Sequence, residues 1–272
     1  RVLHGGDKFK SAVRIDENVI KVLDSLCDLA PLHNPSSVSG IHATRKVLGA
    51  AVPMVAAFDT SFHQTIPERA AIYALPYDLT NKHHLHRYGF HGLAHQYSAM
   101  RYGELTGKKA DQINIVTLHL GNGCSACAIR NSTSIDTSMG FTPLEGLVMG
   151  TRSGDLDPAL VAHLARHEGI DEVENLLNTV SGLIGISGIS SDMRELIAVY
   201  KENPRARLAI DVFCYRARKY LGAYLAALQG ADAVIFSGGI GEHLPLIRKE
   251  ICGGMEWCGV ILDQARNESV LR

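Results

Sequence analysis

Apolar runs that end at glycine limit what this chain can fold into. Residues 113–120 run into Gly121-Asn-Gly123, residues 232–236 run into Ser237-Gly-Gly-Ile-Gly-Glu242, and the opening Arg1-Val-Leu-His precedes Gly5-Gly6. Short apolar runs bounded by glycine are typical of buried strands. Because glycine has no Cβ, N–H groups in such turns can approach phosphate oxygens closely. Together the runs predict a buried sheet with a nucleotide at its edge, although one such turn alone is more often a plain hairpin or helix entry.

The remaining apolar pattern alternates between strand and helix. Apolar residues at helical spacing predict helices over residues 16–28, 41–48, 95–106, 158–167, 173–178, 192–202 and 205–229, and from about residue 245. We expect further strands over residues 1–4, 53–58 and 124–130, with a loop over 30–39. Strands that alternate with helices predict an α/β fold.

Composition excludes several classes of protein. The chain has 272 residues, of which 46% are hydrophobic, and its net charge is −1, so a disordered chain and a basic nucleic-acid binder are both disfavoured. No apolar stretch reaches the roughly 20 residues of a membrane-spanning helix. The length fits one large or two smaller domains. Since the chain opens on Arg1 rather than Met and ends at Leu271-Arg272, it reads as a fragment.

The cysteines and histidines do not match a metal motif. The six cysteines lack the density of a disulfide scaffold, which favours a reducing, cytoplasmic compartment. Cys124 and Cys127 form a CxxC without a second pair, in an expected strand, and we interpret them as packing residues. His91 and His95 could share a helix face as metal ligands, but no HExxH motif is present, and Gly92 favours a helix start between them. No P-loop and no GxGxxG motif follows any strand.

The stretch from Gly140 to Pro158 is too rich in glycine and proline for a regular element, yet most of its other positions are apolar or small. Loops of this kind are packed and commonly bind ligands. Its one cation, Arg152, could bind a carboxylate or phosphate bidentately or could remain a solvated charge. His91, between Gly89 and Gly92, has room for chemistry, although a single loop histidine is more often solvated or capping.

Several motifs along the whole chain resemble the acetate and propionate kinase family. They occur in the following order: Arg1-Val-Leu-His-Gly-Gly6, Ala30-Pro-Leu-His-Asn-Pro35, Phe58-Asp-Thr-Ser-Phe-His-Gln-Thr65, Tyr88-Gly-Phe-His-Gly92, His119-Leu-Gly-Asn-Gly123, Asp136-Thr-Ser-Met-Gly-Phe-Thr-Pro-Leu-Glu-Gly-Leu147, Met149-Gly-Thr-Arg-Ser-Gly154 and Gly239-Ile-Gly-Glu242.

The resemblance implies an α/β fold of the acetate-and-sugar-kinase, Hsp70 and actin superfamily, with two ribonuclease H-like domains of which the first is truncated. Residues 1–60 would be the remnant of the first domain, which contacts substrate and phosphate. Residues 61–272 would form the second domain, which carries the nucleotide site and the homodimer contacts. The implied reaction is the reversible, direct in-line transfer of phosphoryl from ATP to acetate, with Mg²⁺, in the cytoplasm. Acetate, ATP and a second copy of the chain would be the partners, without nucleic acid or membrane.

The resemblance also implies site roles. Arg1 and Arg152 would hold the carboxylate and the transferring phosphoryl group, His91 would hydrogen-bond that group, and Asp59 would be the catalytic carboxylate near magnesium. Leu3, Leu32, Phe90 and Pro143 would line a pocket for the substrate methyl group. The phosphate loop would comprise His119, Leu120, Gly121, Asn122 and Gly123. The adenosine segments would comprise Asp192, Met193, Arg194, Gly239, Ile240, Gly241, Glu242 and His243.

Some positions depart from the family pattern. His243 stands where Asn is usual, Leu93-Ala94 where Thr-Ser is usual, and Leu3 where a smaller Val is common in acetate kinases. The amino-terminal Asn-Gly-Ser-Ser motif and the carboxyl-terminal glutamate that binds magnesium fall outside residues 1–272, so we expect no magnesium ligand in this chain and little activity from it alone. Two alternatives remain: a propionate or short-chain acyl kinase, and a non-catalytic nucleotide-binding module of the same fold.

Overall fold

The fold is built on a four-stranded sheet. The computed structural model describes residues 1–30, 33–49 and 51–269. Its main sheet has the order β5-β4-β3-β6 and consists of β3 (Asn114–Leu120), β4 (Cys124–Arg130), β5 (Thr133–Thr137) and β6 (Ala233–Ser237). β4 runs antiparallel to both β3 and β5, whereas β6 runs parallel to β3. The carboxyl ends of β3 and β6 therefore meet at one edge, where both glycine-rich segments begin.

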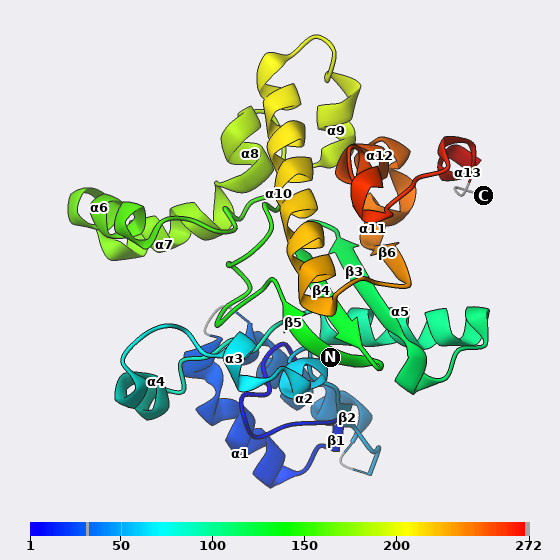
Figure 1. Cartoon of the computed structure of the whole chain (residues 1–272). Helices are drawn as coiled ribbons and strands as arrows, with labels where there is room; N and C mark the ends of the chain where they lie inside the picture. Colours follow the sequence, from blue (N-terminus) through cyan, green and yellow to red (C-terminus); the bar gives the residue numbers. More distant parts are fainter. Residues whose placement is uncertain (31–32, 50, 270–272) are drawn as a thin grey trace.

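Alternating side chains give this sheet two buried faces. Val116 and Leu118 of β3 pack with the long helix α10 (Pro204–Leu228), which crosses one face of the sheet (Figure 1). Ile115 lies in a second cluster with Ala99 of α5 (Gly92–Thr106) on the opposite face. Even-numbered positions of β3 thus face α10 and odd-numbered positions face α5.

The other helices surround this core. Between β5 and β6, before α10, lie α6 (Pro158–Glu168), α7 (Ile170–Thr179), α8 (Gly182–Ser187) and α9 (Met193–Ala198). After β6 come α11 (Gly238–His243), α12 (Pro245–Cys252), η4 (Glu256–Cys258) and α13 (Gln264–Ser269). Before the sheet come η2 (Ser61–Thr65), α3 (Glu68–Ala71), α4 (Tyr77–His83) and η3 (Ala110–Gln112).

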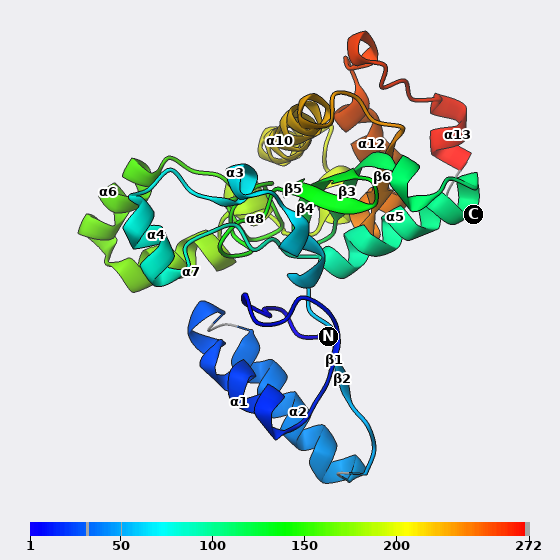
Figure 2. The same ribbon diagram turned by 60° about the horizontal axis from the view of Figure 1, so that its bottom comes forward.

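Residues 1–60 lie to one side of the sheet as a smaller lobe (Figure 2). They comprise β1 (Val13–Arg14), α1 (Glu17–Ser25), η1 (Cys27–Leu29), α2 (Asn34–Leu48) and β2 (Val55–Ala56). Their buried hydrophobic cluster is drawn entirely from residues 2–58.

Three expectations about local structure are wrong in detail. Residues 1–4 form only an isolated bridge from Val2 to Phe58, and the paired strands in this part of the chain are β1 and β2. The expected loop over 30–39 contains the first turns of α2, which starts at Asn34 with Pro35 in its first turn. The glycine-rich segment after β6 is not an open turn, because residues 238–243 form the short helix α11.

The loop between β5 and α6 is held by close backbone packing. Gly154 has φ +69°, and a Cβ there would lie 2.5 Å from the carbonyl oxygens of Gly146 and Leu147. Gly107, at the end of α5, has a similar φ of +70°, but a Cβ there would meet no neighbour within 4 Å. The two glycines therefore share a backbone conformation and differ in the space around them.

We expect Gly154→Ala to destabilise the fold far more than Gly107→Ala. The left-handed backbone costs alanine about 1 kcal/mol at either position. At Gly154 the two carbonyls must also shift, which adds about 2 kcal/mol. Urea unfolding of both variants measures the difference in free energy of unfolding. Equal losses would show that the loop accommodates a side chain at Gly154.

Candidate active site

The turn that ends β3 is the meeting point of the site. A Cβ on Gly123 would lie 3.5 Å from Cε1 of His91, 3.6 Å from its Nε2 and 3.7 Å from Nη1 of Arg152. The amide N of Gly150, in the Arg152 loop, donates to the carbonyl of Asn122 at 2.9 Å. The phosphate-loop, histidine and arginine motifs, far apart in the sequence, therefore come together at one edge of the sheet.

Arg1 and Asp59 form the second part of the site. Nε and Nη2 of Arg1 donate to the two carboxylate oxygens of Asp59 at 2.9 and 2.5 Å. The Asp59 side chain is 2% exposed and that of Arg1 58% exposed, so the carboxylate anchors a cation that still reaches solvent. The hydrogen bond to Asp59 raises the pKa of Arg1. The carbonyl of Asp59 accepts from the N–H of Gly92 at 2.9 Å, which fixes this pair next to His91.

His91 is held in an uncommon conformation at the start of α5. Its φ is +58°, in the left-handed region, and the helix begins at the next residue. Nδ1 is 2.9 Å from Oγ of Ser125, and the ring lies 4.7 Å from that of His119. Burial, followed by the charges of His119, Arg1 and Arg152, lowers the pKa of His91 to about 3. The imidazole is therefore neutral near pH 7.

Arg152 lies half-buried on the loop between β5 and α6. Its Nη1 donates to the carbonyl of Pro143 at 2.9 Å, and burial lowers its pKa, although a guanidinium remains charged. Pro143 also lines a small cavity of about 140 Å³ together with Leu29, Ala30, His33, Thr142, Leu144, Glu174 and Asn178. A cation thus lies beside a compact, largely apolar space.

The expected methyl pocket is only partly assembled from the residues named for it. Phe90 is 1% exposed and packs in the main core, with Leu3 half-buried against the same cluster. Leu32 lies outside the described residues. His33, not singled out from the sequence, lines the small cavity, and burial followed by the charges of Arg152 and Arg1 lowers its pKa. Its position within the Ala30–Pro35 motif could have identified it from the sequence.

A larger cavity of about 630 Å³ borders the turn that follows β3. It is lined by Gly121, Asn122, Ser191, Asp192, Met193, Arg194, Gly239, Ile240, His243 and Leu244. Eight of these ten were expected from the sequence, and Ser191 and Leu244 were not. The expected residues Leu120 and Gly241 are instead buried, and Oε1 of Glu242 accepts from the N–H of Gly238 at 3.1 Å. His119 does not line this cavity, and its Nδ1 is 3.0 Å from Oγ of Ser237.

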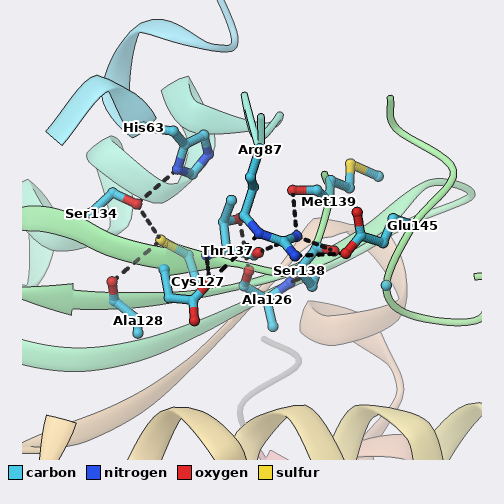
Figure 3. Close-up of polar contacts among 12 residues, drawn as sticks. His63, Arg87, Ala126, Cys127, Ala128, Ser134, Thr137, Ser138, Met139 and Glu145 are labelled. Atoms are coloured by element: carbon cyan, nitrogen blue, oxygen red, sulfur yellow. Dashed lines mark hydrogen bonds and ion pairs between the residues drawn. The ribbon is translucent and has the colours of Figure 1, made fainter. Parts of the chain in front are cut away.

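Arg87 holds the base of the Arg152 loop (Figure 3). Its Nη1 donates to the carbonyls of Thr137, Ser138 and Met139 at 3.0–3.2 Å, and its Nη2 lies 2.6 Å from Oε1 of Glu145. These contacts satisfy the carbonyls where β5 ends and connect the following loop to the segment between α4 and α5. No sequence signal marked Arg87 itself, although it directly precedes the Tyr88–Gly92 motif.

The cysteines occupy packing positions. Cys124 and Cys127 are both buried in β4. Sγ of Cys124 lies 3.1 Å from the Gly121 carbonyl. Sγ of Cys127 lies 3.3 Å from Oγ of Ser134 (Figure 3). Burial raises the pKa of Cys124 to about 12. Within the described ranges, no group of three or more His, Cys, Asp or Glu side chains is arranged to hold a metal ion.

Comparison with known proteins identifies a family. The model of the Acetokinase family matches residues 1–272. Acetate kinase from Chloroherpeton thalassium is 54% identical over 276 residues, which cover 100% of this chain and 66% of that protein. The chain thus spans about two thirds of the length of this curated relative.

Solved structures give the same result. The chain is similar to acetate kinase from Porphyromonas gingivalis, with a TM-score of 0.93, 45% identity, and coverage of 98% of this chain and 68% of that one. It is also similar to a propionate kinase from Francisella tularensis, with a TM-score of 0.95, 42% identity, and coverage of 99% and 70%.

The buried histidines predict that acid destabilises the fold. Burial lowers the pKa of His4 and His63 to about 4 and that of His91 to about 3, and places that of His95 well below its usual value. In the unfolded chain the same groups bind protons near pH 6.5. Stability is therefore present above that pH and is lost as pH falls toward the folded pKa values, by up to about 1.4 kcal/mol per pH unit for each histidine.

Urea unfolding at about pH 7 and about pH 5 tests this. We expect a lower free energy of unfolding at the lower pH, and the same dependence in His163→Gln, which changes an exposed histidine. A free energy of unfolding that does not change between these pH values would contradict the neutral, buried state of the four histidines.

Proposed function

The chain belongs to the acetokinase family, and we propose that it supplies the catalytic groups for ATP-dependent phosphorylation of acetate. Acetate and ATP would give acetyl phosphate and ADP, reversibly. The observation that carries the proposal is the convergence of His91 and Arg152 on Gly123. Pro143, which accepts a hydrogen bond from Arg152, lines a small cavity, and the neighbouring Asn122 lines a larger one.

In this reaction a carboxylate oxygen of acetate attacks the γ-phosphorus of ATP. The new bond joins that oxygen to phosphorus, while the bond from phosphorus to the bridging oxygen of ADP breaks. Acetate is already ionised near pH 7, so no side chain has to remove a proton. Catalysis then depends on position and on charge stabilisation at the phosphoryl oxygens.

The charged groups of the site suit this task. Arg152 and Arg1 would bind the carboxylate and the phosphoryl oxygens through their planar forks. His91 would donate a hydrogen bond from Nε2 to a phosphoryl oxygen. Since both carboxylate oxygens of Asp59 accept from Arg1, we propose that Asp59 acts by holding this guanidinium in place.

The 630 Å³ cavity would bind the nucleotide. Backbone groups at Gly121 and Gly239 would approach it closely, and Asp192 and Arg194 border the same space. We propose that ATP is used as its Mg²⁺ complex, in which the ion supplies charge neutralisation to the phosphates. The described residues do not form a magnesium site by themselves, because no carboxylate cluster is present and Asp59 is paired with Arg1, so no role above depends on the ion.

The apolar cavity of about 140 Å³ has room for a small acyl group, and acetate is the first candidate because the chain is 54% identical to an acetate kinase. A propionate or short-chain acyl kinase remains the second candidate, because one methylene changes discrimination by only about 1–3 kcal/mol and a propionate kinase is among the similar structures. The presence of Arg1, Asp59, His91 and Arg152 in one site argues against a non-catalytic nucleotide-binding module.

We further propose a cytoplasmic homodimer in which residues 1–60 belong to the first domain and residues 61–272 to the second. Free thiols at Cys124, Cys127, Cys214, Cys252 and Cys258 fit a reducing compartment. Leu208 and Tyr215 are exposed along α10 and fit a surface between two copies. No described helix has the length and apolar character to cross a membrane.

We expect Arg152→Lys to lower kcat by about 10²–10³-fold, because a point charge cannot replace a bidentate fork. The assay uses a chimaera in which residues 1–272 replace the matching region of the Chloroherpeton thalassium acetate kinase. KM for ATP should change by less than about twofold. Arg166→Lys, on the exposed side of α6, is the matched control and should leave kcat unchanged. Equal turnover in both variants would show that Arg152 has no role in catalysis.

In the same chimaera, Leu3→Val should increase the ratio of kcat/KM for propionate to that for acetate by about tenfold. The shorter side chain removes one methylene, and discrimination per methylene is of this order. Leu105→Val, at a side chain 70% exposed, serves as the control. An unchanged ratio in Leu3→Val would show that Leu3 does not border the acyl group.

A further inference from the structure

His95 of α5 and His91, which directly precedes this helix, share one buried serine. Ser125 Oγ lies 2.9 Å from Nδ1 of His91 and 2.8 Å from Nε2 of His95. The other nitrogen of His95, Nδ1, lies 2.7 Å from Oγ1 of Thr117. Thr117 and Ser125 belong to the face of the sheet that packs against α5. Both are 0% exposed, and His95 is 1% exposed. Three consecutive contacts therefore connect the middle of β3 to His91.

The protons of this chain can be placed in two ways. In the first, the hydroxyl of Thr117 donates to Nδ1 of His95, Nε2–H of His95 donates to Ser125, and the hydroxyl of Ser125 donates to Nδ1 of His91. The proton of His91 then lies on Nε2, the atom near Gly123. In the second, every donor and acceptor is reversed, and Nε2 of His91 carries a lone pair.

Only the first arrangement satisfies the hydroxyl of Thr117. If Nδ1–H of His95 donated to Thr117, the hydroxyl proton would need another acceptor, and Thr117 Oγ1 has no second partner among the residues that the structure describes. An unpaired buried hydroxyl costs about 1–3 kcal/mol. A second proton on His91, at Nδ1, would make that nitrogen a donor to Ser125. The hydrogen bonds from Ser125 to His95 and from His95 to Thr117 would then be reversed as well.

We propose that Thr117, His95 and Ser125 form a hydrogen-bond relay that keeps His91 neutral with its proton on Nε2, facing the transferred phosphoryl group. They are positioning residues, since all three are buried and none lines the 140 Å³ or the 630 Å³ cavity. The proposal rests on the proposed function insofar as His91 is a donor to phosphate. A lone pair at that position would instead repel an anionic oxygen.

The charged surroundings of His91 act in the same direction. Arg1, Arg152, His119 and His63 face it from four other segments, and each lowers its pKa, as burial does. Burial and the neighbouring histidines hold the pKa of His95 well below its usual value. Both rings therefore stay neutral, and the relay decides which nitrogen of each carries the proton.

The test is the ¹⁵N spectrum of residues 1–272 labelled at histidine, with the His91 signals assigned by their loss in His91→Gln. We expect wild-type His91 to show an unprotonated Nδ1 and a protonated Nε2, with no titration from about pH 5 to about pH 9. A proton on Nδ1, or a titration in this range, would overturn the proposal.

Two variants and a matched control extend the test. Ser125→Ala and Thr117→Val should each turn the single His91 tautomer into a mixture. Thr137→Val removes a buried hydroxyl that donates to the carbonyl of Ala126 at 3.0 Å in the same sheet, outside the relay, and should leave the spectrum of His91 unchanged. If the Ser125 variant keeps the wild-type tautomer, or if all three variants alter it alike, the relay is excluded.

Kinetics in the chimaera separate this proposal from the proposed function. Ser125→Ala should lower kcat by about 10²-fold, the effect of losing one positioned donor, with little change in KM for ATP or acetate. Turnover equal to that of Thr137→Val would overturn the relay's role in catalysis. A chimaera without acetyl phosphate formation whose His91 still shows the expected tautomers would overturn the proposed function and support the relay.

Discussion

The close approach of side chains to the turn Gly121–Gly123 is the contact on which the rest of the site depends. His91 and Arg152 both come within 3.7 Å of the space that a Cβ on Gly123 would occupy. A Cβ on Gly150 would lie 2.0 Å from Oδ1 of Asn122, so a second glycine is needed for the same contact. Because these backbones meet without side chains between them, groups from β3, α5 and the Arg152 loop can act on one small ligand.

Placing cations and histidines so near one another is only stable if the histidines are neutral. Burial lowers the pKa of His91 to about 3, and the nearby arginines act in the same direction. A neutral imidazole still donates one hydrogen bond, while it adds no repulsion to Arg1 and Arg152. The buried face between the sheet and α5 thus supplies a donor of fixed orientation, and the arginines supply the charge.

The sequence predicted the parts of the fold that local patterns determine. The strand over residues 124–130 is confirmed at both ends, and the long helix expected over 205–229 is α10, Pro204–Leu228. β5 was missed, because four of its five residues carry polar or charged side chains and show no clear alternation. α11 was predicted to be a turn, because its three glycines disfavour a helix. In the structure the helix nonetheless begins at Gly238, directly after β6. Arg87 and Ser125 could not be found from the sequence, since their importance arises from contacts with distant segments.

The most direct test of the account is the formation of acetohydroxamate by the wild-type chimaera in the presence of ATP, Mg²⁺, acetate and hydroxylamine. Acetyl phosphate reacts with hydroxylamine, so the account predicts acetohydroxamate in amounts equal to the ADP formed, and neither product without acetate. A folded chimaera that binds ATP and forms no acetohydroxamate, or one that releases ADP to water alone, would contradict the claim that these residues transfer phosphoryl to a carboxylate.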